Sequence, residues 1–128
     1  MPIRQLVIAF AVLSLALVVG CDRAPTHESV MEQQVTTMED VAKLLTTVTD
    51  EASANSAKPK LKELSEKLKA VKAEADKIAK PTKEKEDELR KKYEERITKA
   101  MSAWLMEMGR IGRDPKLRSV LSDLDLGK

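Results

Sequence analysis

Apolar residues in the middle of the chain recur at alternating spacings of four and three positions. The clearest series begins at Ala57 and ends at Ile78. Its members are Ala57, Leu61, Leu64, Leu68, Val71, Ala75 and Ile78. This spacing places all of them on one face of an α-helix, whereas a half-buried strand would alternate at every second residue. The pattern therefore predicts an amphipathic helix over residues 57–80.

Comparable patterns predict three more helices. A second stripe of apolar residues covers 28–54, and Asn55-Ser56 separates it from the helix at 57–80. Thr82 is a suitable N-cap for a helix over 83–110, which Gly109 and Gly112 are expected to end. Asp114-Pro115 is typical of a helix start and predicts a short helix over 115–125.

The chain shows no strand or hairpin pattern to compete with these helices. We therefore predict an all-α domain over residues 28–128. Two architectures use the same apolar seams. One is an antiparallel three-helix bundle with the short helix at one end, and the other is a long helical hairpin that completes its core in an oligomer.

The N-terminus carries an apolar run over residues 6–19, preceded by Arg4. A membrane-spanning helix needs about 20 apolar residues, so this run is too short to span the bilayer comfortably. A short basic segment followed by such a run is typical of a helical signal peptide. We assign residues 1–20 to that signal.

The residues that follow the run, Val18-Val19-Gly20-Cys21, resemble the lipobox of bacterial lipoproteins. The resemblance covers residues 1–21 and implies cleavage after Gly20 and acylation of Cys21. Acyl chains on Cys21 would hold the protein on the membrane almost irreversibly, since each buried methylene contributes about 0.8 kcal/mol. The partner implied for this end of the chain is therefore the lipid bilayer.

The resemblance also implies a location. Residues 21–27 form a lipidated Cys and a short tether, so the helical domain is expected close to the membrane and facing the periplasm or the cell exterior. In some bacterial lipoproteins an Asp after the acylated Cys favours retention in the inner membrane, and Asp22 occupies that position here.

Charge differs between the predicted helices. Residues 28–54 hold one Lys and six acidic residues, whereas residues 57–80 hold eight Lys and four acidic residues. We expect these two neighbours to complement each other, which penalises wrong helix pairings. The alternative is that lysines of the second helix face anionic lipid headgroups. That basic row consists of Lys60, Lys62, Lys67, Lys69 and Lys72.

Composition excludes several kinds of chemistry. One Cys and one His cannot supply an internal disulfide or a Cys/His zinc site, and His27 lies in the predicted tether without a partner for a catalytic triad. A net charge of +2 and three aromatic residues argue against nucleic-acid binding. We expect no catalytic residue, cofactor or metal.

The remaining hypothesis is a non-enzymatic interaction or structural domain of the cell envelope, which binds another protein or itself. The alternative is a carrier of a small molecule or metal that uses a pocket between helices near Trp104 and Met108.

Overall fold

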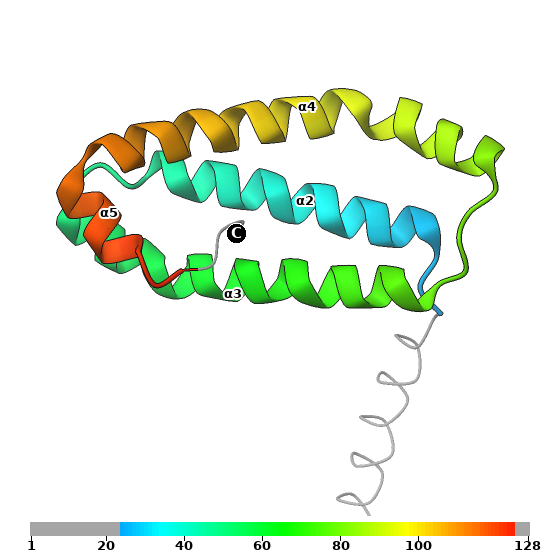
Figure 1. The fold of residues 1–128 in the computed structure, drawn as a ribbon, viewed down its shortest axis with the longest axis horizontal. Helices are drawn as coiled ribbons and strands as arrows, with labels where there is room; N and C mark the ends of the chain where they lie inside the picture. The colour runs from blue at the N-terminus through cyan, green and yellow to red at the C-terminus, as the bar shows by residue number, and fades with distance from the viewer. Residues whose placement is uncertain (1–23, 125–128) are drawn as a thin grey trace, which may run out of the picture.

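The computed structural model describes residues 24–124, which form four helices and no strand (Figure 1). The helices are α2 (His27–Thr46), α3 (Glu51–Lys77), α4 (Lys83–Arg113) and α5 (Pro115–Leu121). The all-α prediction is thereby confirmed. The predicted signal peptide, with Gly20 and Cys21, lies outside the described residues. No helix among those described is long and apolar enough to cross a bilayer.

Helix α2 lies between α3 and α4 and packs against both of them (Figure 1). The chain runs along α2, returns along α3 and runs forward again along α4, so α2 and α4 point in the same direction. Helices α3 and α4 hardly touch each other directly, but α5 packs against both at one end. The domain is therefore a three-helix bundle organised around α2 and closed at one end by α5.

The core has two parts. The larger cluster surrounds Leu45 and Leu61, which are fully buried, at the end of the domain that α5 covers. Its buried members are Val41, Leu45, Val48, Ala54, Ala57, Leu61, Leu64, Ile111, Leu117 and Leu121. The smaller cluster joins Val35 of α2 to Leu89 and Tyr93 of α4.

The break between the first two helices differs from the prediction. Helix α2 ends at Thr46 rather than at residue 54. At this end, the hydroxyl of Thr46 donates to the carbonyl of Lys43 at 2.5 Å, and the hydroxyl of Thr47 donates to the carbonyl of Leu44 at 2.6 Å. Side chains that bond to the local backbone compete with helix continuation.

Helix α3 begins at Glu51, six residues before the predicted start. Asp50 is its N-cap and accepts from the backbone N–H of Ser53 at 2.7 Å, while the Ser53 hydroxyl accepts from the backbone N–H of Asp50 at 3.0 Å. This reciprocal capping box satisfies two backbone donors at the helix end. Because the helix starts there, Asn55 lies inside it, and the Asn55 side chain donates to the carbonyl of Glu51 at 2.9 Å.

The other boundaries lie closer to the predictions. Thr82 caps α4 as expected, accepting from the N–H of Lys85 at 3.3 Å. Helix α4 continues through Gly109 and Gly112 to Arg113, so the glycines do not end it. Neither glycine has the positive φ of a left-handed helix end. Helix α4 ends before Asp114, which is the N-cap of α5 and accepts from the N–H of Lys116 at 2.9 Å.

Two further helices, α3 and α5, also end earlier than predicted. Helix α3 ends at Lys77 rather than residue 80, and Ile78 has an extended backbone. Pro81 disfavours helical geometry at the residue before it, which limits the helix on this side. Helix α5 ends at Leu121, with a turn over the following residues, whereas the prediction extended to residue 125, which is outside the described range.

Pro59 is the residue in α3 least suited to its position. It lies inside the helix and is exposed to solvent, whereas the predicted start at residue 57 would have placed it in the first turn. A proline has no N–H to donate to the carbonyl four residues earlier, which here belongs to Asn55.

We expect Pro59→Ala to stabilise the domain by about 2 kcal/mol, after allowance for the greater freedom of the unfolded chain. The measurement is urea unfolding followed by circular dichroism. Lys62→Ala, at an exposed position one turn further on, is the matched control and should change stability little. A Pro59→Ala variant no more stable than the control would contradict the prediction.

Candidate functional site

An ion-pair cluster joins α2 to α4 through the guanidinium of Arg96. Arg96 donates from Nη1 to both carboxylate oxygens of Glu32 at 2.9 Å, and from Nε and Nη2 to those of Glu39, also at 2.9 Å. Its Nη2 also lies 3.3 Å from the hydroxyl of Thr36. Because Glu32, Thr36 and Glu39 are spaced by four and three residues, one face of α2 presents all three to Arg96.

The same seam continues toward the start of α2. Lys92 forms an ion pair with Glu28, one turn before Arg96 and Glu32. Both cations lie over the buried ring of Tyr93, with Lys92 Nζ 5.5 Å and Arg96 Cζ 5.8 Å from its centroid. These contacts are cation–π interactions, which add to the ion pairs.

The cluster shifts the pKa of each carboxylate and each cation toward the charged form. Hydrogen bonds from Arg96 lower the pKa of the Glu32 and Glu39 carboxyls below 4.5, and the hydrogen bond from Lys92 does the same for Glu28. The pKa of Arg96 rises for the reciprocal reason. Burial, followed by the hydrogen bond to Glu32, raises the pKa of Tyr93. A general acid at neutral pH needs a raised carboxyl pKa, so this cluster is suited to holding helices together rather than to proton transfer.

This arrangement corrects the predicted charge pairing. Within the part of the chain that the structure describes, the acidic residues Glu28, Glu32 and Glu39 of α2 form their cross-helix ion pairs with Lys92 and Arg96 of α4. Sequence reasoning missed the cluster because it compared net charges of consecutive helices. The signal was present in the spacing, since Glu28 and Glu32 are four residues apart and so are Lys92 and Arg96.

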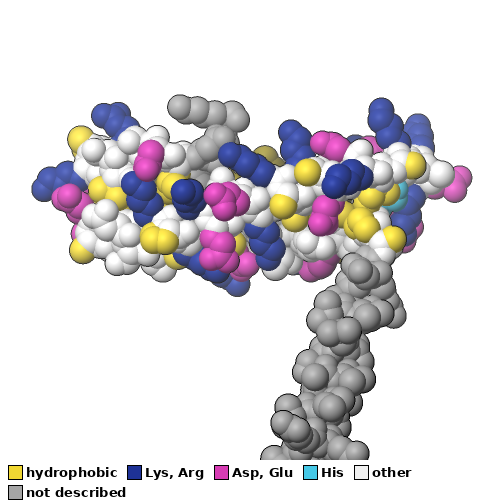
Figure 2. Space-filling view, turned by 90° about the horizontal axis from the view of Figure 1, so that it is seen from below, with side chains coloured by type: hydrophobic (Ala, Val, Ile, Leu, Met, Phe, Trp, Pro, Cys, Tyr) yellow, Lys and Arg dark blue, Asp and Glu magenta, His cyan; other side chains and the backbone are white. Residues whose placement is uncertain are grey.

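The five lysines of the predicted basic row all lie on α3 and are exposed, but they occupy different sides of it. At about 100° per residue, Lys60 and Lys67 share one flank, and Lys62 and Lys69 share the other. Lys60 and Lys67 line a shallow depression between α2 and α3, together with Asp40. Figure 2 shows basic and acidic side chains interspersed over this side of the molecule.

A cavity of about 320 Å³ lies at the end of the domain opposite α5, where α2 begins. Its lining comes from α2, from the C-terminal end of α3 and the turn after it, and from α4. The apolar lining residues are Val30, Met31, Ala75, Ile78, Pro81, Leu89 and Ile97, and the polar ones are His27, Gln34, Glu86 and Arg90. Hydrophobic side chains are visible at this end in Figure 2. His27, predicted to lie in the tether, is instead the first residue of α2 and half-buried.

The second half of α4 exposes a surface without charged side chains, which we call the uncharged face. Its members are Thr98, Met101, Ser102, Leu105, Met106 and Gly109. The largest side chains are well exposed, with Met101 at 48%, Leu105 at 68% and Met106 at 74%. Nothing lies within 4 Å of a Cβ built on Gly109 or on Gly112, one turn further on. In a chain with 34% charged residues, this surface is unusually apolar.

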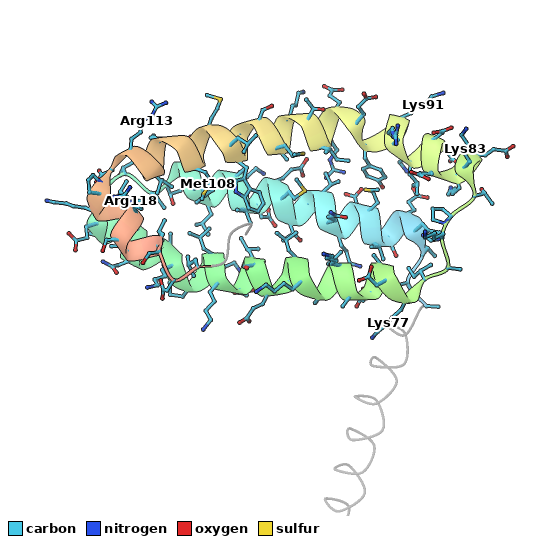
Figure 3. The ribbon with its side chains drawn as sticks, in the orientation of Figure 1. Lys77, Lys83, Lys91, Met108, Arg113 and Arg118 are labelled. Carbon is cyan, nitrogen blue, oxygen red and sulfur yellow. The ribbon has the colours of Figure 1, made fainter. Side chains whose placement is uncertain are left out.

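Trp104 and Met108, the residues predicted to line a ligand pocket, lie on a different side of α4. Both are half-buried and pack against the larger core cluster. Figure 3 shows Met108 directed from α4 toward α2. Their side chains therefore fill space between helices α4, α2 and α5. Within residues 24–124, no group of three or more His, Cys, Asp or Glu side chains is arranged to hold a metal ion.

No known protein family model, curated protein or solved structure matches this chain.

The Arg96 cluster makes stability depend on pH in a defined direction. Since the folded pKa values of Glu32 and Glu39 lie below 4.5, their contribution is present above that pH and is lost as pH falls through the folded values. We expect Arg96→Met to be less stable than the wild type at about pH 7, and the difference to narrow at about pH 3. Urea unfolding, followed by the fluorescence of the single tryptophan, Trp104, measures both.

Arg90→Met is the matched control, because Arg90 is on the same helix and its nearest carboxylate, on Glu86, is 3.9 Å away. It should change stability little at either pH. An equal loss at both pH values in Arg96→Met would show that packing of the arginine stem, and not the ion pairs, carries its effect.

Proposed function

We propose that this chain is a lipid-anchored protein of a bacterial cell envelope, and that its helical domain acts by binding another protein or itself. The observation that carries the interaction role is the uncharged face of α4. Leu105 and Met106 are apolar but are 68% and 74% exposed. Neither belongs to a core cluster of the described residues. Exposed apolar patches of this kind mark interaction surfaces.

The chemistry of the carboxylates supports a non-enzymatic role. In residues 24–124, each carboxyl group whose pKa shifts has a lowered value, through an ion pair or a helix-capping hydrogen bond. Carboxylates used in this way stabilise the fold in their charged state. The active sites of acid–base enzymes instead hold groups with pKa values near the working pH.

The lipid anchor rests on the sequence around Cys21. The apolar run over residues 6–19 delivers the thiol to the membrane surface, and His27, only six residues later, is already helical. Six residues span at most about 20 Å, so the domain lies close to the bilayer. Asp22 favours the inner membrane, with the domain facing the periplasm. Lysines of α3, led by the flank with Lys62, would orient it on anionic lipid.

A second candidate function is a carrier for a small apolar molecule. The observation that favours it is the cavity at the start of α2, whose walls are largely apolar. Trp104 and Met108 do not contribute to that cavity, since they pack at the opposite end of the domain. Native mass spectrometry of the purified protein would show a bound molecule as added mass.

We expect Cys21→Ser to release the protein from the membrane or to leave its signal peptide uncleaved, because serine offers no thiol for acylation. Membrane fractionation and the mass of the mature protein measure the two effects. Ser29→Ala, which adds no charge and leaves Cys21 intact, is the control and should stay membrane-bound. A Cys21→Ser protein that is processed and membrane-bound like the wild type would disprove the lipid anchor.

A further inference from the structure

We propose that the uncharged face of α4 binds a second copy of this chain, with the two α4 helices antiparallel. This inference deepens the interaction role proposed above by naming the surface and the partner. It rests on the sequence of exposed residues along α4, on the space over its glycines, and on the charges at either end of the face.

The outer surface of α4 changes character along its length. On the side of α4 that carries the uncharged face, the residues before it are mostly acidic, and Lys83 and Lys91 are the two basic residues among them. These acidic residues are Glu84, Asp87, Glu88, Glu94 and Glu95. After the face comes Arg113, the last residue of α4, which is exposed. Arg113 has no ion-pair partner within residues 24–124, and Figure 3 shows it directed away from the bundle.

A surface with an acidic segment at one end, an uncharged segment in the middle and Arg113 at the other end is complementary to itself only in the antiparallel sense. Glu95 and Arg113 are eighteen residues apart, which is about five full helical turns, so both lie on the same side of α4. A two-fold axis at the level of residue 104 places Glu95 of each copy opposite Arg113 of the other. Within its own helix Glu95 already pairs with Lys99 at 2.7 Å, and this pair is exposed, so Arg113 can join it. A parallel pair would instead place acidic segment on acidic segment and Arg113 on Arg113.

The centre of the face suits a close contact between helices. Met101, Leu105 and Met106 provide the exposed apolar side chains, and methionines adapt to the shape of a partner. The open space over Gly109 and Gly112 allows a partner side chain to approach the backbone. A two-fold contact is the commonest symmetry of homo-oligomers, and it uses the same patch on both copies.

The contact is tested with two differently tagged full-length copies, co-expressed and co-purified from detergent-solubilised membranes. In Leu105→Lys, the new charges of both copies face each other near the axis, and we expect co-purification to fall at least about tenfold. Ala70→Lys adds the same charge at an exposed position of α3 and should leave co-purification unchanged. Circular dichroism confirms that both variants retain their helices. Equal co-purification in the two variants would overturn the proposal.

Charge reversal tests the antiparallel orientation. Arg113→Glu should weaken co-purification because it meets Glu95 of the second copy, and adding Glu95→Arg to the same chain should restore it. A single reversal without effect, or a double reversal that does not recover, would overturn the antiparallel pairing.

A photoreactive amino acid at position 105 identifies what lies on the face in cells. The expected product is a crosslinked species with twice the mass of the chain and both tags. A product formed only with a different protein would overturn the second copy as the occupant. The same experiment in Cys21→Ser separates the two proposals. In Cys21→Ser we expect the crosslinked dimer to form even though the protein has lost its lipid anchor. If Cys21→Ser stays attached to the membrane, the proposed lipid anchor is wrong, but the proposed dimer contact is not affected.

Discussion

The domain depends on the burial of one helix, α2, from two sides. Its acidic stripe and Val35 face α4, while Val41 and Leu45 belong to the core that includes α3 and α5. Helices α3 and α4 hardly touch each other, so α2 holds them in place. Even its buried Thr37 is satisfied internally, since the hydroxyl donates to the carbonyl of Gln33 at 2.6 Å. A buried hydroxyl without a partner would oppose folding.

The two ends of the bundle differ as a consequence. At one end, α5 lies across α3 and α4, and Leu117 and Leu121 complete the larger cluster. At the other end no helix of residues 24–124 lies across α3 and α4 in the same way, and the cavity opens there beside His27. This also explains why the apolar series of α3 is buried only in part. Leu61, Leu64 and Val71 are covered, whereas Ala75 is exposed beside the cavity.

Helix starts could be predicted from the sequence where the apolar spacing was regular and only one N-cap candidate was present. Thr82 and Asp114 are such caps, and both start helices where expected. The break at Thr47 was missed because two local signals competed. Asn55-Ser56 resembles a turn, but the reciprocal bonds of Asp50 with Ser53 decide where the helix begins. The prediction that Gly109 and Gly112 end the helix was wrong, since both are helical and lie on an open surface of α4.

The seam between α2 and α4 could not be derived from net charge, because it depends on which helices are neighbours and on their relative direction. Once α2 and α4 are parallel, two of the ion pairs share one offset: Glu28 pairs with Lys92 and Glu32 with Arg96, each 64 residues apart. Arg96 also reaches Glu39, 57 residues away and about two turns further along α2 than Glu32. The offset is 65 for Arg110, which donates to the carbonyl of Leu45 at 2.9 Å. Each exposed ion pair contributes little to the free energy of unfolding. Together, however, the ion pairs form only when α4 has this position along α2, so they disfavour structures in which α4 has slid along α2.

The fold thus uses only part of α4. Its inner side is specified by the core and by Arg96, so those residues follow from the need to pack against α2. The residues at the outer side of its second half have no such role, and charged side chains there would improve solubility without disturbing any buried contact. Folding therefore does not explain why exposed positions 101, 105 and 106 hold Met, Leu and Met rather than charged residues, in a chain with 34% charged residues. A surface that folding does not explain is where the function of a non-enzymatic domain is best sought.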